Sequence, residues 1–189
     1  MKQDEILFVS ATAEEAAHVT GQPVLITGIG TTRCAVTLME YLAERRPRHI
    51  INIGTAGSLG GLNGIFEISS VLRHDVSDEL IAKITGKPFP NEITLRPTGL
   101  FPVARLATGD SFIADGEVRD KIAARADLVD MEGHVVAFIG RRLRIPVTLL
   151  KQVSDQADDS AARTWGEAVA QGALELASAG DRVVRHIRG

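Results

Sequence analysis

Short runs of apolar residues alternate along this chain with segments whose apolar positions recur every three to four residues. Four to eight consecutive apolar residues are typical of strands that are covered on both faces. Such runs lie at 6–10, 23–27, 49–53, 68–72, 103–107, 126–131 and 145–153. Helical spacing marks 13–18, 31–45, 115–125, 133–142 and 161–187, and residues 86–102 are mostly irregular. Strands separated by helices predict an α/β fold with a largely parallel sheet and helices on both of its faces.

Composition places the chain among ordinary globular proteins. Of its 189 residues, 44% are apolar and 24% are charged, and the net charge is −3. We expect a single domain over residues 1–189. The charge gives no support for a nucleic-acid partner, and no apolar run approaches the ~20 residues of a membrane span. Because the N-terminus also lacks the layout of a secretion signal, we expect a cytoplasmic protein with no membrane partner.

Metal and disulfide chemistry find little support in the sequence. The single cysteine, Cys34, excludes an internal disulfide and a cysteine-rich metal site. Asp130, Glu132 and His134 alternate along the chain, so they would meet at one ion only if strand geometry continued through all three. We therefore expect no metal site.

Glycines follow three of the predicted strands, within residues 27–30, 53–57 and 108–110. Glycine allows positive φ and lets the backbone approach a ligand closely. For residues 54–57 we expect a tight turn whose amides could face an oxygen atom. Gly28 and Gly30 lack the third glycine of a dinucleotide fingerprint, and no glycine turn continues into the Lys-Ser or Lys-Thr of a P-loop. We expect no cofactor.

Two acidic elements come directly after apolar, strand-like runs. They are Val-Asp-Met-Glu-Gly at 129–133 and Val-Ser-Asp at 153–155. In an open α/β sheet, ligands bind at the carboxyl ends of the strands. Two carboxylates delivered there could hold a sugar and protonate a leaving group. The structural alternative is that Glu132 caps the following helix and Asp155 starts a turn.

Taken in order along the chain, six segments resemble the nucleoside phosphorylase/nucleosidase superfamily, and most of all its methylthioadenosine/S-adenosylhomocysteine nucleosidases. The segments are SATAEEA (10–16), TGIG (27–30), NIGTAG (52–57), TGDSFI (108–113), VDMEG (129–133) and VSD (153–155). The resemblance implies a three-layer α/β/α fold with a central, mostly parallel mixed sheet, a purine nucleoside ligand and a homodimer. The chain is short for the family, because only about a dozen residues separate its first two strands and the usual hairpin there is absent.

The resemblance also implies which residues act on the bond that is cleaved. Asp155 matches the general acid that protonates N7 of the purine, and Ser154 would orient it. Glu15 matches the residue that activates the attacking water, with Glu14 as the alternative if the register is shifted by one. Thr55 would help to place the water or the sugar.

A second set of residues matches the substrate-binding positions of the family. Glu132 would hold the ribose hydroxyls, with Met131 packed on the sugar. Phe112 would stack on the base, although a role as a core aromatic is an equal alternative. The backbone of Ile113 would contact the edge of the base, and Gly57 belongs to the same substrate-binding set.

The nucleophile can be predicted from the absence of arginine. Phosphate needs cationic, preferably bidentate, partners. Phosphorylases of the superfamily place one arginine before the central glycine segment and another after the first strand. Here those places hold Asn52 and a loop, 11–18, without arginine or lysine. We therefore expect water as the nucleophile and an N-glycosyl hydrolase. A phosphate-dependent purine nucleoside phosphorylase and a non-catalytic nucleoside-binding module stay open as alternatives.

Asp155 also bears on the base. A carboxylate can accept a hydrogen bond from a 6-amino group, so it favours an adenine nucleoside, whereas futalosine hydrolases carry asparagine at this place. On the other hand, Met131, Glu132, Gly133 and the compact N-terminal half resemble the futalosine hydrolases at least as well. A futalosine-type hydrolase therefore stays open, and the sequence does not determine the 5′ substituent of the nucleoside.

Overall fold

The computed structural model describes residues 5–111, 113, 116–157 and 161–189, with side chains in the last range from residue 169 onward. The strands are β1 (Ile6–Ser10), β2 (Val24–Ile26), β3 (His49–Ser58), β4 (Ile65–Arg73), β5 (Ile93–Thr94), β6 (Val103–Thr108), β7 (Leu128–Asp130) and β8 (Val147–Asp155). The helices are α1 (Thr31–Glu44), α2 (Asp78–Thr85), α3 (Gly116–Ala123), α4 (Gly133–Leu143) and α5 (Ala161–Arg188).

All the strands join one mixed sheet. Its order is β2-β1-β3-β7-β6-β4-β5, and β8 pairs with both β3 and β4. Parallel pairs connect β1 with β2 and β3, β3 with β8, and β6 with β4 and β7. The antiparallel pairs are β3 with β7, and β4 with β5 and β8. The prediction of an α/β fold with a mixed, mostly parallel sheet is confirmed.

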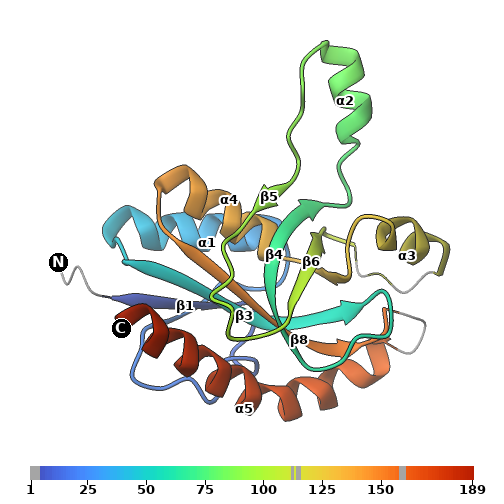
Figure 1. Cartoon of the computed structure of the whole chain (residues 1–189). Helices are drawn as coiled ribbons and strands as arrows, with labels where there is room; N and C mark the ends of the chain where they lie inside the picture. Colours follow the sequence, from blue (N-terminus) through green and yellow to red (C-terminus); the bar gives the residue numbers. More distant parts are fainter. Residues whose placement is uncertain (1–4, 112, 114–115, 158–160) are drawn as a thin grey trace.

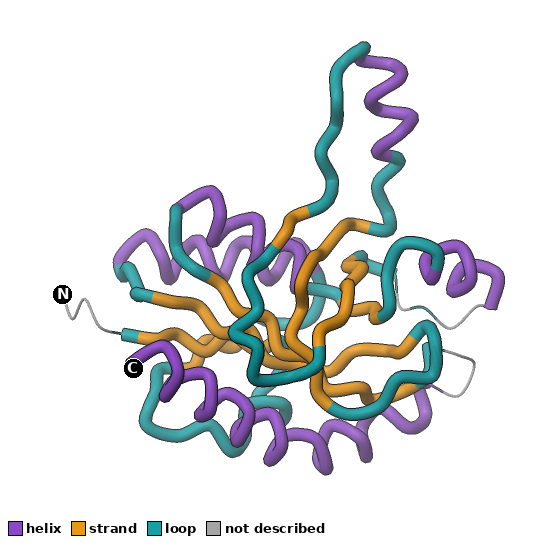
Figure 2. Tube along the Cα trace, viewed as in Figure 1, coloured by secondary structure: helices purple, strands orange, loops and turns teal. Residues whose placement is uncertain are grey.

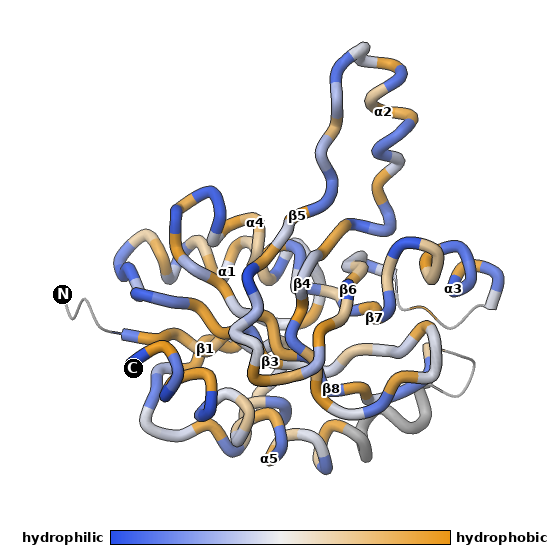
Figure 3. The backbone as a smooth tube through the Cα atoms, viewed as in Figure 1, coloured by the Kyte–Doolittle hydropathy of each residue, from blue (hydrophilic) through white to orange (hydrophobic). Residues whose placement is uncertain are grey.

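The two faces of the sheet pack against different helices. Along β1, Leu7 and Val9 join a cluster with buried residues of α1 and α4, whereas Ile6 and Phe8 join a cluster with α5. Figure 1 shows α1 and α4 on one side of the sheet and α5 on the other, and Figure 3 shows the apolar positions concentrated on the strands between them. A Cβ at Gly180 would lie 2.4 Å from the Phe8 ring, so glycine lets α5 approach the sheet closely.

Between β4 and β5 the chain leaves the body of the protein as an arm, residues 74–92, that carries α2 (Figure 2). None of the residues of α2 is buried, and Leu80 and Ile84 are 55% and 75% exposed. Apart from β5, residues 86–102 contain no helix or strand, as predicted. No helix in the described part of the chain is both long and apolar enough to cross a membrane.

Two local predictions are wrong. Residues 13–18 form turns and not a helix. Thr12 and Glu15 exchange the reciprocal hydrogen bonds of a capping box, but the chain then closes only three-residue turns, from the Ala17 amide to the Glu14 carbonyl and from the Val19 amide to the Ala16 carbonyl. Residues 54–57 do not turn but continue β3, which pairs with β8 through Gly57, with a register shift after Ala56, and with β7 from Gly57. Within this extended strand, Gly54 lets Glu15 approach the backbone and Gly57 lets Asp155 approach it.

Candidate active site

A cavity of about 310 Å³ lies at the carboxyl ends of the parallel strands β1, β3 and β8. This volume is at the lower end of the range for small-molecule sites. Segments distant in sequence line it: the loop after β1, Ile29 before α1, the end of β3, the loop after β6, and the ends of β7 and β8. The residues predicted to bind substrate or act on it that line the cavity are Glu15, Thr55, Gly57, Ile113, Met131, Glu132, Ser154 and Asp155. Phe112 lies outside the described residues.

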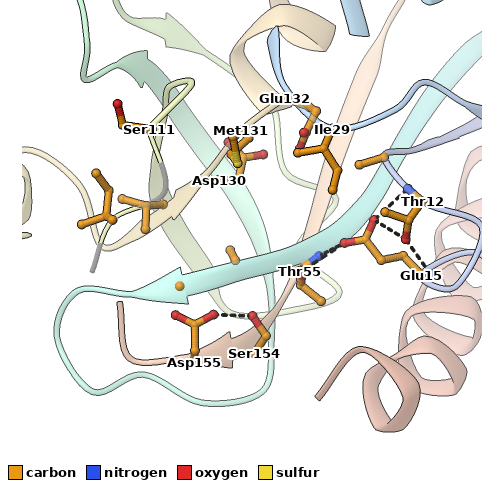
Figure 4. A pocket seen from close by; sticks show the side chains of 15 residues that line it. Thr12, Glu15, Ile29, Thr55, Ser111, Asp130, Met131, Glu132, Ser154 and Asp155 are labelled. Carbon is orange, nitrogen blue, oxygen red and sulfur yellow. Dashed lines mark hydrogen bonds between the residues drawn. The ribbon is translucent and has the colours of Figure 1, made fainter. Parts of the chain in front are cut away.

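Glu15 is held at the wall of the cavity by five donors from three residues. One carboxylate oxygen accepts from the Thr55 amide at 2.8 Å and from the Thr55 hydroxyl at 2.9 Å. The other accepts from the Thr12 amide at 3.3 Å and the Thr12 hydroxyl at 3.5 Å (Figure 4). It also accepts from the Ser10 hydroxyl at 3.1 Å. Glu15 is 4% exposed, whereas Glu14 is exposed and does not line the cavity. Of the two candidates, Glu15 is the one that can act on a bound ligand.

Asp155 lies on a different wall, at the end of β8. Its Oδ2 accepts from the Ser154 hydroxyl at 2.7 Å (Figure 4), and its Oδ1 accepts from the Ala157 amide at 2.9 Å. The second bond is the turn that the structural alternative predicted, and it fixes the carboxylate at the cavity. A Cβ on Gly57 would lie 2.9 Å from Asp155 Oδ1. Gly57 therefore acts by leaving room for this carboxylate.

Glu132 is the third acid, and its side chain does not cap α4. Instead, Glu132 Oε1 accepts from the Gly30 amide at 2.7 Å, across a gap of 102 residues in the sequence. Burial, and then the negative charge of Asp130, raises the pKa of Glu132 to about 7. The Gly133 amide is satisfied by Asp130 Oδ2 at 2.8 Å, so Glu132 is left to face the cavity.

Lys151 is a residue that the sequence analysis missed. It lies on β8 beneath the cavity, 1% exposed, with its Nζ 2.8 Å from Asp130 Oδ2. Burial alone would lower the pKa of Lys151, but the carboxylates of Asp130, Glu132 and Glu15 raise it overall. Asp130 also accepts from the Thr108 hydroxyl. The sequence carries a sign of this arrangement, because Lys151 directly follows the apolar pair Leu149 and Leu150 within a predicted strand.

These side chains form a compact set of acids with one buried cation behind them. Of the described residues that line the cavity, none is lysine or arginine. Lys151 is paired with Asp130 and lies outside the lining. Chemically, the site can accept hydrogen bonds from hydroxyl groups, stabilise a developing positive charge and transfer protons, and it offers no cationic grip on a phosphate.

Comparison with known proteins gives a consistent result. A 5′-methylthioadenosine nucleosidase and a 5′-methylthioadenosine/S-adenosylhomocysteine nucleosidase, both from Arabidopsis thaliana, are 32% and 29% identical over 70% of this chain. The chain spans about half of these relatives, 53% and 56% of their lengths. A 5′-methylthioadenosine/S-adenosylhomocysteine nucleosidase from Staphylococcus epidermidis is 27% identical over 78% of this chain and 74% of its own length.

Solved structures share the fold. A Helicobacter pylori 5′-methylthioadenosine/S-adenosylhomocysteine nucleosidase superposes with a TM-score of 0.85 at 19% identity, over 98% of this chain and 99% of that one. A mutant futalosine hydrolase of the same organism gives 0.81 at 18% identity, over 93% and 96%. The family model described as "Phosphorylase superfamily" matches residues 10–96 and 100–187, so the chain belongs to the phosphorylase superfamily.

Proposed function

We propose that this protein is a purine nucleoside N-glycosidase that hydrolyses the N-ribosidic bond of an adenine nucleoside of the methylthioadenosine/S-adenosylhomocysteine type. The observation that carries the proposal is the convergence of Glu15, Glu132 and Asp155 on one nucleoside-sized cavity. The names of the relatives in sequence support the choice of substrate class.

In the proposed reaction, Asp155 donates a proton to N7 of the purine while the bond between N9 and C1′ breaks. The electron pair of that bond leaves with the base, which becomes neutral when it takes the proton. Ser154 and the Ala157 amide hold the Asp155 carboxylate in place for the transfer. The Asp155 carboxylate also accepts a hydrogen bond from a 6-amino group, which favours adenine over a 6-oxo purine.

The sugar becomes an oxocarbenium ion as the base leaves. Glu132 accepts hydrogen bonds from the ribose hydroxyls, with Met131 against the sugar, and the negative charge of its ionised form stabilises the cation. Water then attacks C1′, and Glu15 takes its proton. Thr55 holds the Glu15 carboxylate through two hydrogen bonds and so sets the position of the water.

Water rather than phosphate is the proposed nucleophile because a phosphate dianion would meet Glu15 and Glu132 without a cation among the described lining residues. The futalosine-type hydrolase is the second candidate, and a structural neighbour of that kind supports it. Incubation with methylthioadenosine, S-adenosylhomocysteine, adenosine, inosine and futalosine, each with and without phosphate, tests the proposal. Release of adenine without phosphate is the expected result. Phosphate-dependent release would indicate a phosphorylase, and binding without release would indicate a binding module.

We also infer a single-domain, three-layer α/β/α architecture, since α1 and α4 share one hydrophobic cluster with the sheet and α5 shares the other. A cytoplasmic homodimer completes the proposal. Its support is a set of exposed apolar side chains on α1 and α4, which pack side by side: Val36 (53% exposed), Met39 (45%) and Phe138 (51%). Light scattering coupled to gel filtration tests the dimer.

A further inference from the structure

A further carboxylate, that of Asp110, connects two walls of the cavity without lining it. Asp110 follows β6, in the loop that brings Ser111 and Ile113 to the cavity. Its Oδ1 accepts from the Thr31 amide at 2.6 Å, and its Oδ2 accepts from the Thr31 hydroxyl. The loop after β6 is thus bound, through a side chain, to the first residue of α1, 79 positions earlier in the chain.

The same end of α1 holds Glu132. The Gly30 amide donates to Glu132 Oε1 at 2.7 Å, and the next amide, that of Thr31, donates to Asp110. Two carboxylates therefore occupy consecutive amides at a helix N-terminus, where the helix dipole stabilises negative charge. Gly30 has φ +99°, and a Cβ there would lie 3.2 Å from Asp110 Oδ1. Only glycine suits both the backbone conformation and the approach of Asp110.

Asp110 is also fixed from its other side, at the end of β4. Its amide donates to Asp75 Oδ2 at 3.0 Å. Asp75 in turn accepts two bonds of 2.8 Å from the Arg73 guanidinium, and Arg73 lies 3.9 Å from the Asp110 carboxylate. A Cβ on Gly109 would lie 2.4 Å from the His74 ring, so the loop packs directly on this end of the strand. Asp110 therefore has little freedom to shift relative to either wall.

We propose that Asp110 is a positioning residue of this enzyme. By binding both the amide and the hydroxyl of Thr31, it sets the distance between the wall of Ser111 and Ile113, which faces the base, and Glu132, which faces the ribose. This assignment of the walls rests on the proposed function. A misplacement of about 1 Å can cost on the order of 100-fold in rate, so a fixed separation of the two binding walls matters for turnover.

Kinetics of Asp110 variants test the proposal. Asp110→Ala is expected to lower kcat/KM by roughly 10- to 100-fold. Asp110→Asn is expected to recover most of this loss, because its carbonyl can still accept from the Thr31 amide while its amino group donates to the hydroxyl. The matched control is Asp120→Ala on α3, whose side chain is 72% exposed and pairs only with its neighbour Arg119 among the described contacts. Wild-type kcat/KM in Asp110→Ala would overturn the proposal.

A double-mutant cycle separates positioning from a loss of general stability. If Asp110 acts through the support of Glu132, then Glu132→Gln should cost at least about fivefold less in the Asp110→Ala background than in the wild type. Equal costs in the two backgrounds would contradict the proposal, because a merely structural role leaves the two effects independent.

A readout without substrate keeps the test independent of the proposed function. The Gly30 amide is bonded to Glu132 and not to Asp110. Its hydrogen exchange, followed by NMR, should accelerate at least about fivefold in Asp110→Ala and in Thr31→Val, and should stay unchanged in Asp120→Ala. Accelerated exchange in a protein that cleaves no nucleoside would refute the proposed function and leave the coupling intact. Unchanged exchange at Gly30 in both variants would refute the coupling itself.

Discussion

The cavity and the root of the arm both contain acidic side chains paired with cations, but the two regions differ in solvation. Beneath the cavity, the side chains of Lys151 and Asp130 are each 1% exposed. At the root of the arm, Arg125 pairs with Asp78 at the same distance of 2.8 Å, with the Arg125 side chain 47% exposed. Burying charges is costly, whereas exposed pairs contribute little. Two ion pairs of equal length can therefore have different roles. The cost of burying Lys151 and Asp130 is explained by the cavity that they support, whereas the pair of Arg125 and Asp78 needs no such explanation.

The largest expected effect is on kcat, which should fall when an acid at the cavity is replaced and not when an acid at the root of the arm is replaced. Asp155→Asn should reduce kcat on an adenine nucleoside by about 10²–10⁴-fold, the usual scale for loss of a general acid. The matched change at the arm, Asp78→Asn, should alter kcat by less than about twofold, because Asp78 contacts only Arg125, Asn91 and local backbone among the described residues. Steady-state assays of adenine release measure both. Full activity in Asp155→Asn would show that the acid is misassigned.

The next effect compares the two cations by stability. Lys151→Met should lower the free energy of unfolding by about 3–5 kcal/mol, because it leaves Asp130 charged and unpaired in the protein interior. Arg125→Met removes a partly exposed partner and should cost at most about 1 kcal/mol. Urea denaturation gives both values. Similar losses in the two variants would mean that solvation does not distinguish these pairs.

The smallest effect is a pH dependence of ligand affinity, which we expect at the cavity and not at the root of the arm. Burial raises the pKa of Glu132 to about 7, so this group is protonated below that pH and ionised above it. An ionised carboxylate accepts hydroxyl hydrogen bonds more strongly, and we expect the affinity for a ribose-bearing inhibitor to rise up to about tenfold from pH 6 to pH 8. Titration calorimetry should show this rise in the wild type and not in Glu132→Gln.

The same raised pKa has a consequence for stability. The folded state keeps the proton of Glu132 at pH values where the unfolded chain has already lost it. Its contribution is therefore fully present below the ordinary pKa of glutamate and is lost as the pH rises through about 7. Asp78, whose pKa is lowered to about 2 first of all by Arg125, behaves in the opposite sense and loses its contribution only in strong acid.

Much of this architecture could be predicted from the sequence because apolar periodicity records burial. The strands and the long helices follow from it, and the acids at the ends of β7 and β8 follow from their positions after apolar runs. The predicted helix at 13–18 is wrong although Thr12 and Glu15 make the local bonds of a helix start. Glu15 also binds Thr55, 40 residues away, and a contact of this kind leaves no local pattern. The predicted turn at 54–57 failed for a related reason. Gly54 and Gly57 leave room for the carboxylates of Glu15 and Asp155, and the chain does not change direction there.

The partners of Lys151 and of Asp110 could not be predicted from the sequence for a different reason. A lysine that follows apolar residues within a strand indicates a buried charge, but its partner can be identified only when β7 is placed beside β3 and β3 beside β8. Likewise, Asp110 stands in a recognisable Thr-Gly-Asp segment, yet its partner Thr31 is the first residue of α1, 79 positions earlier in the chain. Pairing between distant strand ends is set by sheet topology, which local spacing does not encode.

The most direct test of the central claim is a crystal structure of the protein with a non-hydrolysable analogue of an adenine nucleoside. The account predicts the purine N7 within hydrogen-bond distance of Asp155, the ribose hydroxyls on Glu132, and a water molecule between Glu15 and C1′. An analogue bound outside this cavity, or bound in it with its ribose away from Glu132 and its base away from Asp155, would contradict the account.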